Sequence, residues 1–152
     1  MKDKPDHHDA DLVLKVYEMR REPKMRESRD AITQKFWPRS YDDVAAVMKF
    51  DHPLNAAWRQ VSTFWEMVYG MTKHGIVHAD YFLESNGEGF LLFAKIAPFL
   101  AELREKNSPR MFQNAEWAAT NTNTGKVVFA MFQGRVEAMA KTFEAFEEAA
   151  KK

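Results

Sequence analysis

The feature that most constrains the fold of this chain is a long apolar repeat near its C-terminus. Between residues 126 and 150, apolar side chains recur at alternating steps of three and four, the spacing of one face of an α-helix. At about 1.5 Å per residue such a helix spans about 35 to 40 Å, which is long for a small domain. The repeat therefore predicts one long C-terminal helix whose apolar face consists of Phe129, Phe132, Val136, Met139, Phe143, Phe146 and Ala150.

The rest of the chain also shows helical spacing and no alternation typical of strands. The segment from Leu54 to His74 carries a broad apolar face, and Gly75 is a plausible C-cap after it. The segment from Phe90 to Arg104 is apolar almost all round, and Pro98 inside it should bend the helix. We predict a single all-α domain over residues 9–152, a bundle of about six or seven helices with these two segments as its core.

Local signals give further boundaries. Pro23 suits the first turn of a second helix, Ser40 suits an N-cap, and Ser108 followed by proline suits the start of a short helix. The polar run 120–125 indicates a loop before the last helix. Residues 1–8 are charged and have little to bury, so we expect a mobile tail there.

Composition excludes several classes of protein. The chain has 152 residues, 45% of them hydrophobic, which suits one compact core. Its 22 basic and 22 acidic residues balance, so no global charge favours nucleic acid or an anionic membrane. Without cysteine there is no disulfide, thiolate metal site or cysteine nucleophile. The charged N-terminus lacks a secretory signal, and no apolar run is long enough to span a membrane, so we expect a cytoplasmic protein.

The first two helices are locally basic, with four acidic residues interleaved. This pattern indicates an exposed helical face with ion pairs between successive turns, and it does not favour nucleic-acid binding. The basic residues are Lys15, Arg20, Arg21, Lys24, Arg26, Arg29 and Lys35.

No set of residues has the spacing of a catalytic or metal site. His74, His78, Asp80 and Glu84 lie close in sequence, but Gly75 between the histidines should break the helix that would align them. There is also no phosphate-binding glycine loop, nucleophile elbow or dinucleotide motif. We therefore expect no metal, no cofactor and no catalytic residues, and favour a protein that is not an enzyme.

Four charged residues interrupt or adjoin apolar helices, where an unpaired charge is costly: Arg59, Glu66, Glu88 and Lys95. One interpretation is that they form structural ion pairs with one another. The other is a polar centre in an aromatic pocket, in which Arg59, Glu66 and Lys95, with Trp65 beside them, orient a small ligand.

The best-defined feature remains the apolar face of the last helix, so we favour a non-enzymatic interaction module that self-associates through this helix or recruits a partner helix. Packing of the same face inside the bundle is the alternative placement. The alternative function is binding of an apolar small molecule between helices, in a pocket lined by aromatic and methionine side chains.

Several segments resemble a family of small uncharacterised bacterial helical proteins, over roughly residues 12 to 105. The long C-terminal helix lies outside the resemblance. What the resemblance implies is a bacterial all-helical domain, without an activity. The segments that carry it are Val16-Tyr17-Glu18-Met19-Arg20-Arg21-Glu22-Pro23, Asn55-Ala56-Ala57-Trp58-Arg59, Phe64-Trp65-Glu66-Met67, Asn86-Gly87-Glu88 and Lys95-Ile96-Ala97-Pro98-Phe99-Leu100.

Overall fold

The computed structural model describes residues 2–152, and every regular element in this part of the chain is a helix, with no strand. The predicted all-α fold with a long C-terminal helix is confirmed. The elements are α1 (His7–Arg21), α2 (Pro23–Lys35), α3 (Tyr41–Val47), α4 (Asn55–Lys73), α5 (Ala79–Ser85), α6 (Gly89–Ile96), the 3-10 helix η1 (Ala97–Phe99), α7 (Leu100–Lys106), α8 (Gln113–Asn121) and α9 (Asn123–Ala150).

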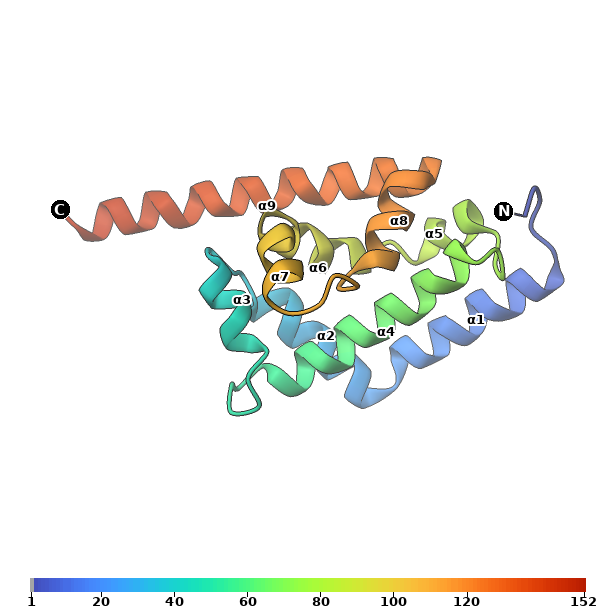
Figure 1. The fold of residues 1–152 in the computed structure, drawn as a ribbon, viewed down its shortest axis with the longest axis horizontal. Coiled ribbons are helices and arrows are strands. Elements are labelled where there is room, and N and C mark those ends of the chain that lie inside the picture. The colour runs from blue at the N-terminus through green and yellow to red at the C-terminus, as the bar shows by residue number, and fades with distance from the viewer. Residues whose placement is uncertain (1) are drawn as a thin grey trace.

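The helices form three layers, as Figure 1 shows. At the bottom of that view lie α1, α2 and α4, with α4 packed against α2. A middle layer contains α5 to α8, and α8 packs on the other side of α4. Across the top runs α9, in contact with α5, α6 and α8. The helix is so long that its C-terminal end extends beyond the layers below it.

Aromatic rings connect the layers through the core. Tyr69 of α4 stacks on Phe90 of α6 with ring centroids 4.8 Å apart. Phe129 of α9 lies 5.0 Å from Phe93 and 6.2 Å from Phe90. Aromatic pairs stabilise a fold beyond the burial of their apolar area, so this column of rings holds α9 against α6. The two segments predicted to form the core, α4 and the region around α6, are indeed at its centre.

Pro98 bends its segment as expected, but it does so by dividing it. Helix α6 ends at Ile96, a single 3-10 turn holds the proline, and α7 begins at Leu100. A proline cannot donate the hydrogen bond that continues an α-helix, so the chain tightens there. This division adds elements to the six or seven that the sequence indicates.

Three expected boundaries are wrong. The apolar spacing of the first helix predicts a start near Asp9, but α1 begins at His7, because Asp6 forms a capping box with Asp9. Helix α8 begins only at Gln113, since Phe112 adopts a left-handed φ of 56°. The other boundaries predicted from Pro23, Ser40 and Gly75 are confirmed, with Gly75 at a φ of 68°.

The third error is the loop expected over residues 120–125. A single residue, Thr122, separates α8 from α9. Its hydroxyl accepts a hydrogen bond from the Gly125 amide at 2.9 Å and donates one to the Ala118 carbonyl at 2.7 Å. Threonine therefore caps one helix while it closes the other, and the polar run forms a tight corner.

The N-terminal residues lie close to this fold. Asp9 is buried and accepts hydrogen bonds from the Lys2 ammonium at 3.0 Å and the His78 amide at 2.9 Å. Burial opposes ionisation of Asp9, but these bonds outweigh it and lower the pKa of the carboxyl. In the segment expected to be a mobile tail, residue 1 lies outside the described residues. The Lys2 ammonium donates to the carboxylates of both Asp6 and Asp9.

Candidate functional site

The polar residues predicted to line a ligand pocket occupy separate places. Glu66 projects from α4 to the start of α8, where its carboxylate accepts hydrogen bonds from the amides of Asn114 at 3.1 Å and Ala115 at 2.8 Å. Burial raises the pKa of this carboxyl, although the two amides oppose that shift. Glu66 therefore serves as the N-terminal cap of a neighbouring helix.

Arg59 is exposed on the same helix, one turn after Asn55. Its Nε donates to the Asn55 side-chain oxygen at 2.9 Å, and its guanidinium lies 5.1 Å from the ring of Phe50. Phe50 is itself 84% exposed. The structure thus leaves Arg59 on the surface, apart from Glu66 and Lys95.

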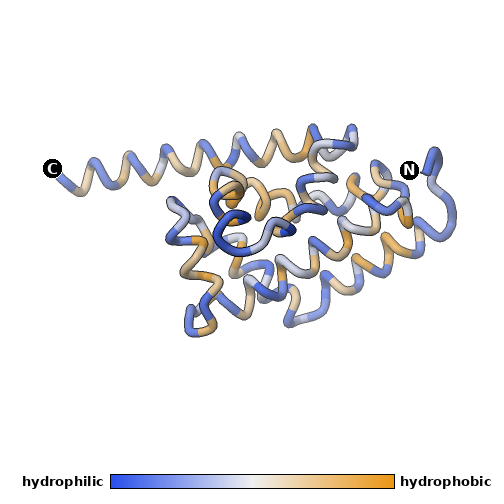
Figure 2. Tube along the Cα trace, viewed as in Figure 1, coloured by the Kyte–Doolittle hydropathy of each residue, from blue (hydrophilic) through white to orange (hydrophobic). Residues whose placement is uncertain are grey.

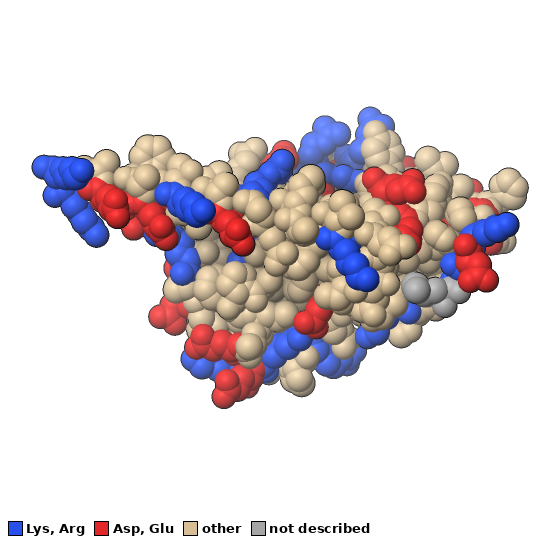
Figure 3. Space-filling model, turned by 90° about the horizontal axis from the view of Figure 1, so that it is seen from above, with Lys and Arg blue, Asp and Glu red and all other residues tan. Residues whose placement is uncertain are grey.

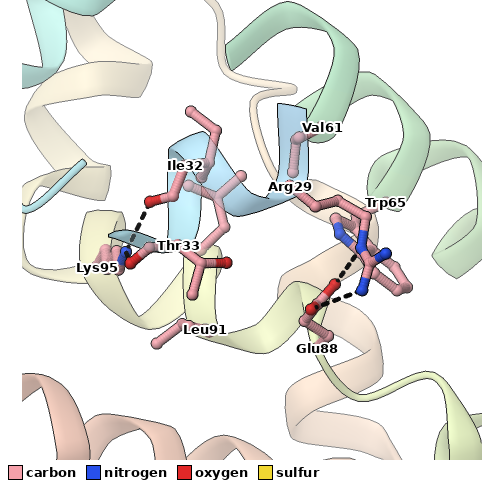
Figure 4. Close-up of a pocket in the computed structure, with 9 residues that line it drawn as sticks. Arg29, Ile32, Thr33, Val61, Trp65, Glu88, Leu91 and Lys95 are labelled. Carbon is pink, nitrogen blue, oxygen red and sulfur yellow. Dashed lines mark hydrogen bonds and ion pairs between the residues drawn. The ribbon is translucent and has the colours of Figure 1, made fainter. Parts of the chain in front are cut away.

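Lys95 is almost completely buried on α6. Its ammonium donates to the carbonyl oxygens of Ile32 at 2.9 Å and Thr33 at 3.1 Å, in the last turn of α2, and lies 3.8 Å from the ring centre of Trp37. Burial lowers the pKa of Lys95 to about 7. Figure 4 shows the lysine reaching the end of α2 from below. The carbonyls carry the negative end of the helix dipole, so this position suits a cation.

Glu88 pairs with Arg29, a residue that the sequence pattern assigned to an exposed basic face. The Arg29 guanidinium donates two hydrogen bonds to the Glu88 carboxylate, one from Nε at 2.6 Å and one from Nη2 at 2.8 Å (Figure 4). Bidentate pairs of this kind are among the stronger charged contacts. Nearby, Arg20 lies over the Trp65 ring at 5.6 Å and donates to the Ser85 carbonyl at 3.0 Å. For Arg20 and Arg29 the exposed-face interpretation is therefore wrong.

A cavity of about 10 Å³ lies between this ion pair and Lys95, bordered by Trp65. That volume is about the space of one water molecule and too small for an organic ligand. Of the four residues predicted for a ligand pocket, the structure brings only Trp65 and Lys95 to a common cavity. Glu66 borders a different hollow, beside Arg110 and Met111.

The apolar face of α9 changes its surroundings along the helix. Phe132 is buried, and Phe129 and Val136 pack against the core. Farther on, Met139 and Phe143 are half-buried, and Phe146 is 69% exposed. The face is therefore packed internally at least as far as Val136, and its side chains become more exposed beyond that residue.

We call residues 137–150 of α9 the overhang. Figure 1 shows this end projecting beyond the bundle, and Figure 2 shows apolar positions continuing along it. Contacts near Phe143 hold it to the bundle: the Phe143 ring lies 6.3 Å from Trp37 and 6.0 Å from the guanidinium of Arg39, which also pairs with Glu147. The partners come from the linker between α2 and α3, the linker that Lys95 anchors.

The overhang has two distinct faces. Steps of three and four place Met139, Phe146 and Ala149 on one side, with Thr142 among them, and place most of the charges on a second, opposite face. We call the first set the apolar stripe. Thr142 donates its hydroxyl to the Ala138 carbonyl at 3.0 Å, so its polar group is satisfied within the helix. Figure 3 shows acidic and basic side chains along this end of the molecule. The charged face consists of Glu137, Lys141, Glu144 and Glu148.

The family model described as a domain of unknown function (DUF4760) matches residues 5–122. The chain belongs to the DUF4760 family. No curated protein and no solved structure matches it. The DUF4760 region spans α1 to α8 and ends at Thr122, the N-cap of α9, so the long helix lies outside the region that defines the family.

The segments that carried the resemblance meet in the DUF4760 region. Arg20 donates to the side-chain oxygen of Asn86 at 3.3 Å and lies over Trp65, while Tyr69 donates to the Asn86 carbonyl at 2.9 Å. Glu88 follows two residues later and holds Arg29. These residues join α1, α2, α4 and the start of α6, which is a structural role.

Within residues 2–152, no helix is long and apolar enough to cross a membrane. In the same part of the chain no three potential metal-binding side chains gather. Of the residues considered for metal binding, His78 caps α5 by accepting from the Tyr81 amide at 3.1 Å, and Asp80 accepts from the Thr124 amide at 2.7 Å.

Proposed function

We propose that the protein is a non-enzymatic helical interaction module that self-associates through the apolar stripe of the overhang. The observation that carries the proposal is the 69% exposure of Phe146 on a helix end that projects past its own bundle (Figure 1). A large aromatic side chain in this position gains free energy when a partner surface covers it.

A second copy fits the stripe because the stripe is self-complementary. In a two-fold antiparallel pair, residue i of one copy contacts residue j of the other and the reverse contact is equivalent. When the pair is centred near Thr142, Met139 of each copy faces Phe146 of the other. The charged face points away from this contact, so no like charges are buried.

The expected affinity is modest. Covering two methionine and two phenylalanine side chains, already partly covered, contributes on the order of 8 kcal/mol at about 2 kcal/mol each. Association costs at least about 4 kcal/mol in lost freedom of motion. The net gain of at most about 4 kcal/mol corresponds to a dissociation constant of about 1 mM, so we expect a dimer whose population becomes substantial as the concentration approaches about 1 mM.

The test is the absolute mass in solution, from light scattering or sedimentation, at concentrations up to about 1 mM. We expect Phe146→Glu and Met139→Glu to give monomers. Val127→Glu is the matched control, because Val127 is 71% exposed on the same helix but lies outside the stripe, and it should leave the dimer intact. A monomer at every concentration of the unchanged chain contradicts the proposal, as does a dimer that persists in both stripe variants.

Shortening α9 from its C-terminal end gives a second test, provided that the part of the helix packed on the core is kept. Removal of all of α9 would uncover Phe90 and Phe93, which stack against Phe129, and would confuse dissociation with unfolding. A chain ending at Ala138 keeps Phe129, Phe132 and Val136 on the core. We expect this shorter chain to remain helical and to become monomeric.

A further inference from the structure

A pocket of about 250 Å³ lies on the other flank of the overhang. It is a half-open pocket bordered by the linker between α2 and α3, the 3-10 turn η1 and α9, and it shares no residue with the apolar stripe. Among its lining residues are Trp37, Phe99, Glu137, Ala140, Phe143 and Glu144. We call it the Trp37 pocket.

The walls of the Trp37 pocket are mostly aromatic and aliphatic. The rings of Trp37, Phe99 and Phe143 surround it, and two prolines stiffen the segments that carry the first two. A cavity of about 150 Å³ with apolar walls holds benzene. A volume of 250 Å³ therefore suits a molecule with one or two fused rings and a short side chain.

The charge available in the pocket is negative. The Lys95 ammonium is already occupied by two carbonyls and the Trp37 ring, and Arg39 pairs with Glu147. By contrast, Glu137 and Glu144 form no ion pair within residues 2–152, the part of the chain that the structure describes. Both are exposed and line the pocket, two helical turns apart.

We propose that the Trp37 pocket binds a small organic amine, with an aromatic ring system between Trp37 and Phe143 and an ammonium group beside Glu137 or Glu144. Apolar walls with a few placed polar groups are the common design of ligand pockets. An ammonium near aromatic faces gains a cation–π contribution in addition to its ion pair. The site is independent of the proposed self-association, because the two surfaces use different residues of α9.

The experiment compares three probes that share one ring: tryptamine, neutral indole and indole-3-acetate. Binding to the full-length chain is measured by calorimetry at low salt. We expect tryptamine to bind up to about 10-fold more tightly than indole, and indole-3-acetate to bind most weakly, because partly exposed ion pairs contribute modestly. Failure of all three probes to bind at millimolar concentration overturns the proposal, and so does tightest binding of the acetate.

Variants separate the charge from the cavity. Glu137→Gln with Glu144→Gln should remove the advantage of tryptamine over indole while indole still binds. Glu148→Gln is the matched control, since this carboxylate lies on the same helix outside the pocket, and should change nothing. Ala140→Leu should fill the cavity and abolish binding of all three probes. Binding that survives Ala140→Leu, or an advantage of tryptamine that survives the double variant, contradicts the assignment.

Discussion

Replacement of Lys95 by methionine should alter how stability depends on pH. The lysine is 1% exposed, and burial lowers the pKa of its ammonium from 10.5 to about 7. In the unfolded chain the group is protonated below about pH 10.5. Folding therefore favours the neutral amine, and the charged form is held in the core at a cost. Methionine keeps an unbranched side chain of similar length and removes the titration.

The direction and size follow from the two pKa values. Above pH 10.5 the amine is neutral in both states and contributes no pH-dependent cost; as pH falls through 7, the cost grows to its full value. At about 1.36 kcal/mol per pKa unit, the difference between 10.5 and about 7 corresponds to about 4.8 kcal/mol. Between pH 7 and 9.5 the free energy of unfolding should rise by up to about 3 kcal/mol.

The predicted rise in the free energy of unfolding is an upper limit, because the Ile32 and Thr33 carbonyls and the Trp37 ring stabilise the ammonium. The window ends at pH 9.5 because burial also raises the pKa of the Tyr69 phenol. That group begins to cost stability once the phenol ionises in the unfolded chain, above about pH 10.

The measurement is urea denaturation at several values of pH, for the unchanged chain and Lys95→Met. The difference in unfolding free energy between them should change with pH in favour of the unchanged chain as pH rises. Lys126→Met is the matched control, because Lys126 is exposed on α9, and it should follow the unchanged chain. Parallel curves for the unchanged chain and Lys95→Met would refute the reasoning.

Three further predictions concern stability, measured by denaturation. Gly125→Ala should destabilise the chain by more than about 2 kcal/mol, because a new Cβ would clash with the α8 backbone. Gly134 has open space around it, so Gly134→Ala should stabilise the chain by up to about 1 kcal/mol. Equal effects of the two variants would contradict the packing at Thr122. Glu66→Ala should cost about 1 to 2 kcal/mol through loss of the α8 cap, and no loss would show the cap to be unimportant. Arg29→Met should lower the free energy of unfolding by about 1 to 3 kcal/mol in the unchanged chain, and by less in a chain that already carries Glu88→Gln. If the losses from the two substitutions simply add, the pair is not coupled.

The sequence predicts most of the fold because its strongest signals are local. Apolar spacing places α4 and α9, and single residues such as Pro23, Ser40 and Gly75 mark helix ends through their own backbone or hydrogen-bonding preferences. Thr122 shows where this reasoning fails. A run of threonine, asparagine and glycine is typical of a loop, yet one threonine hydroxyl bridges two helices and leaves no loop.

Local spacing does not identify the contacts of the polar residues, because their partners are distant in sequence. Arg29 and Glu88 are 59 residues apart, and Glu66 caps a helix 48 residues away. Nothing in the spacing around Arg29 distinguishes it from its exposed basic neighbours. The resemblance segments around Arg20, Trp65 and Glu88 were the available signal, since they come together in the structure.

The apolar repeat of α9 shows how one sequence pattern can serve several surfaces. A straight helix turns by about 20° per heptad relative to a seven-residue repeat, so successive members of the repeat face gradually different directions. Phe129 and Phe132 face the core, Phe143 faces the linker at Trp37, and Phe146 faces outward. The division coincides with the end of the bundle rather than with any change in the repeat. Because the length of the bundle depends on how the other helices pack, the exposed part of the repeat could be located only in the folded chain.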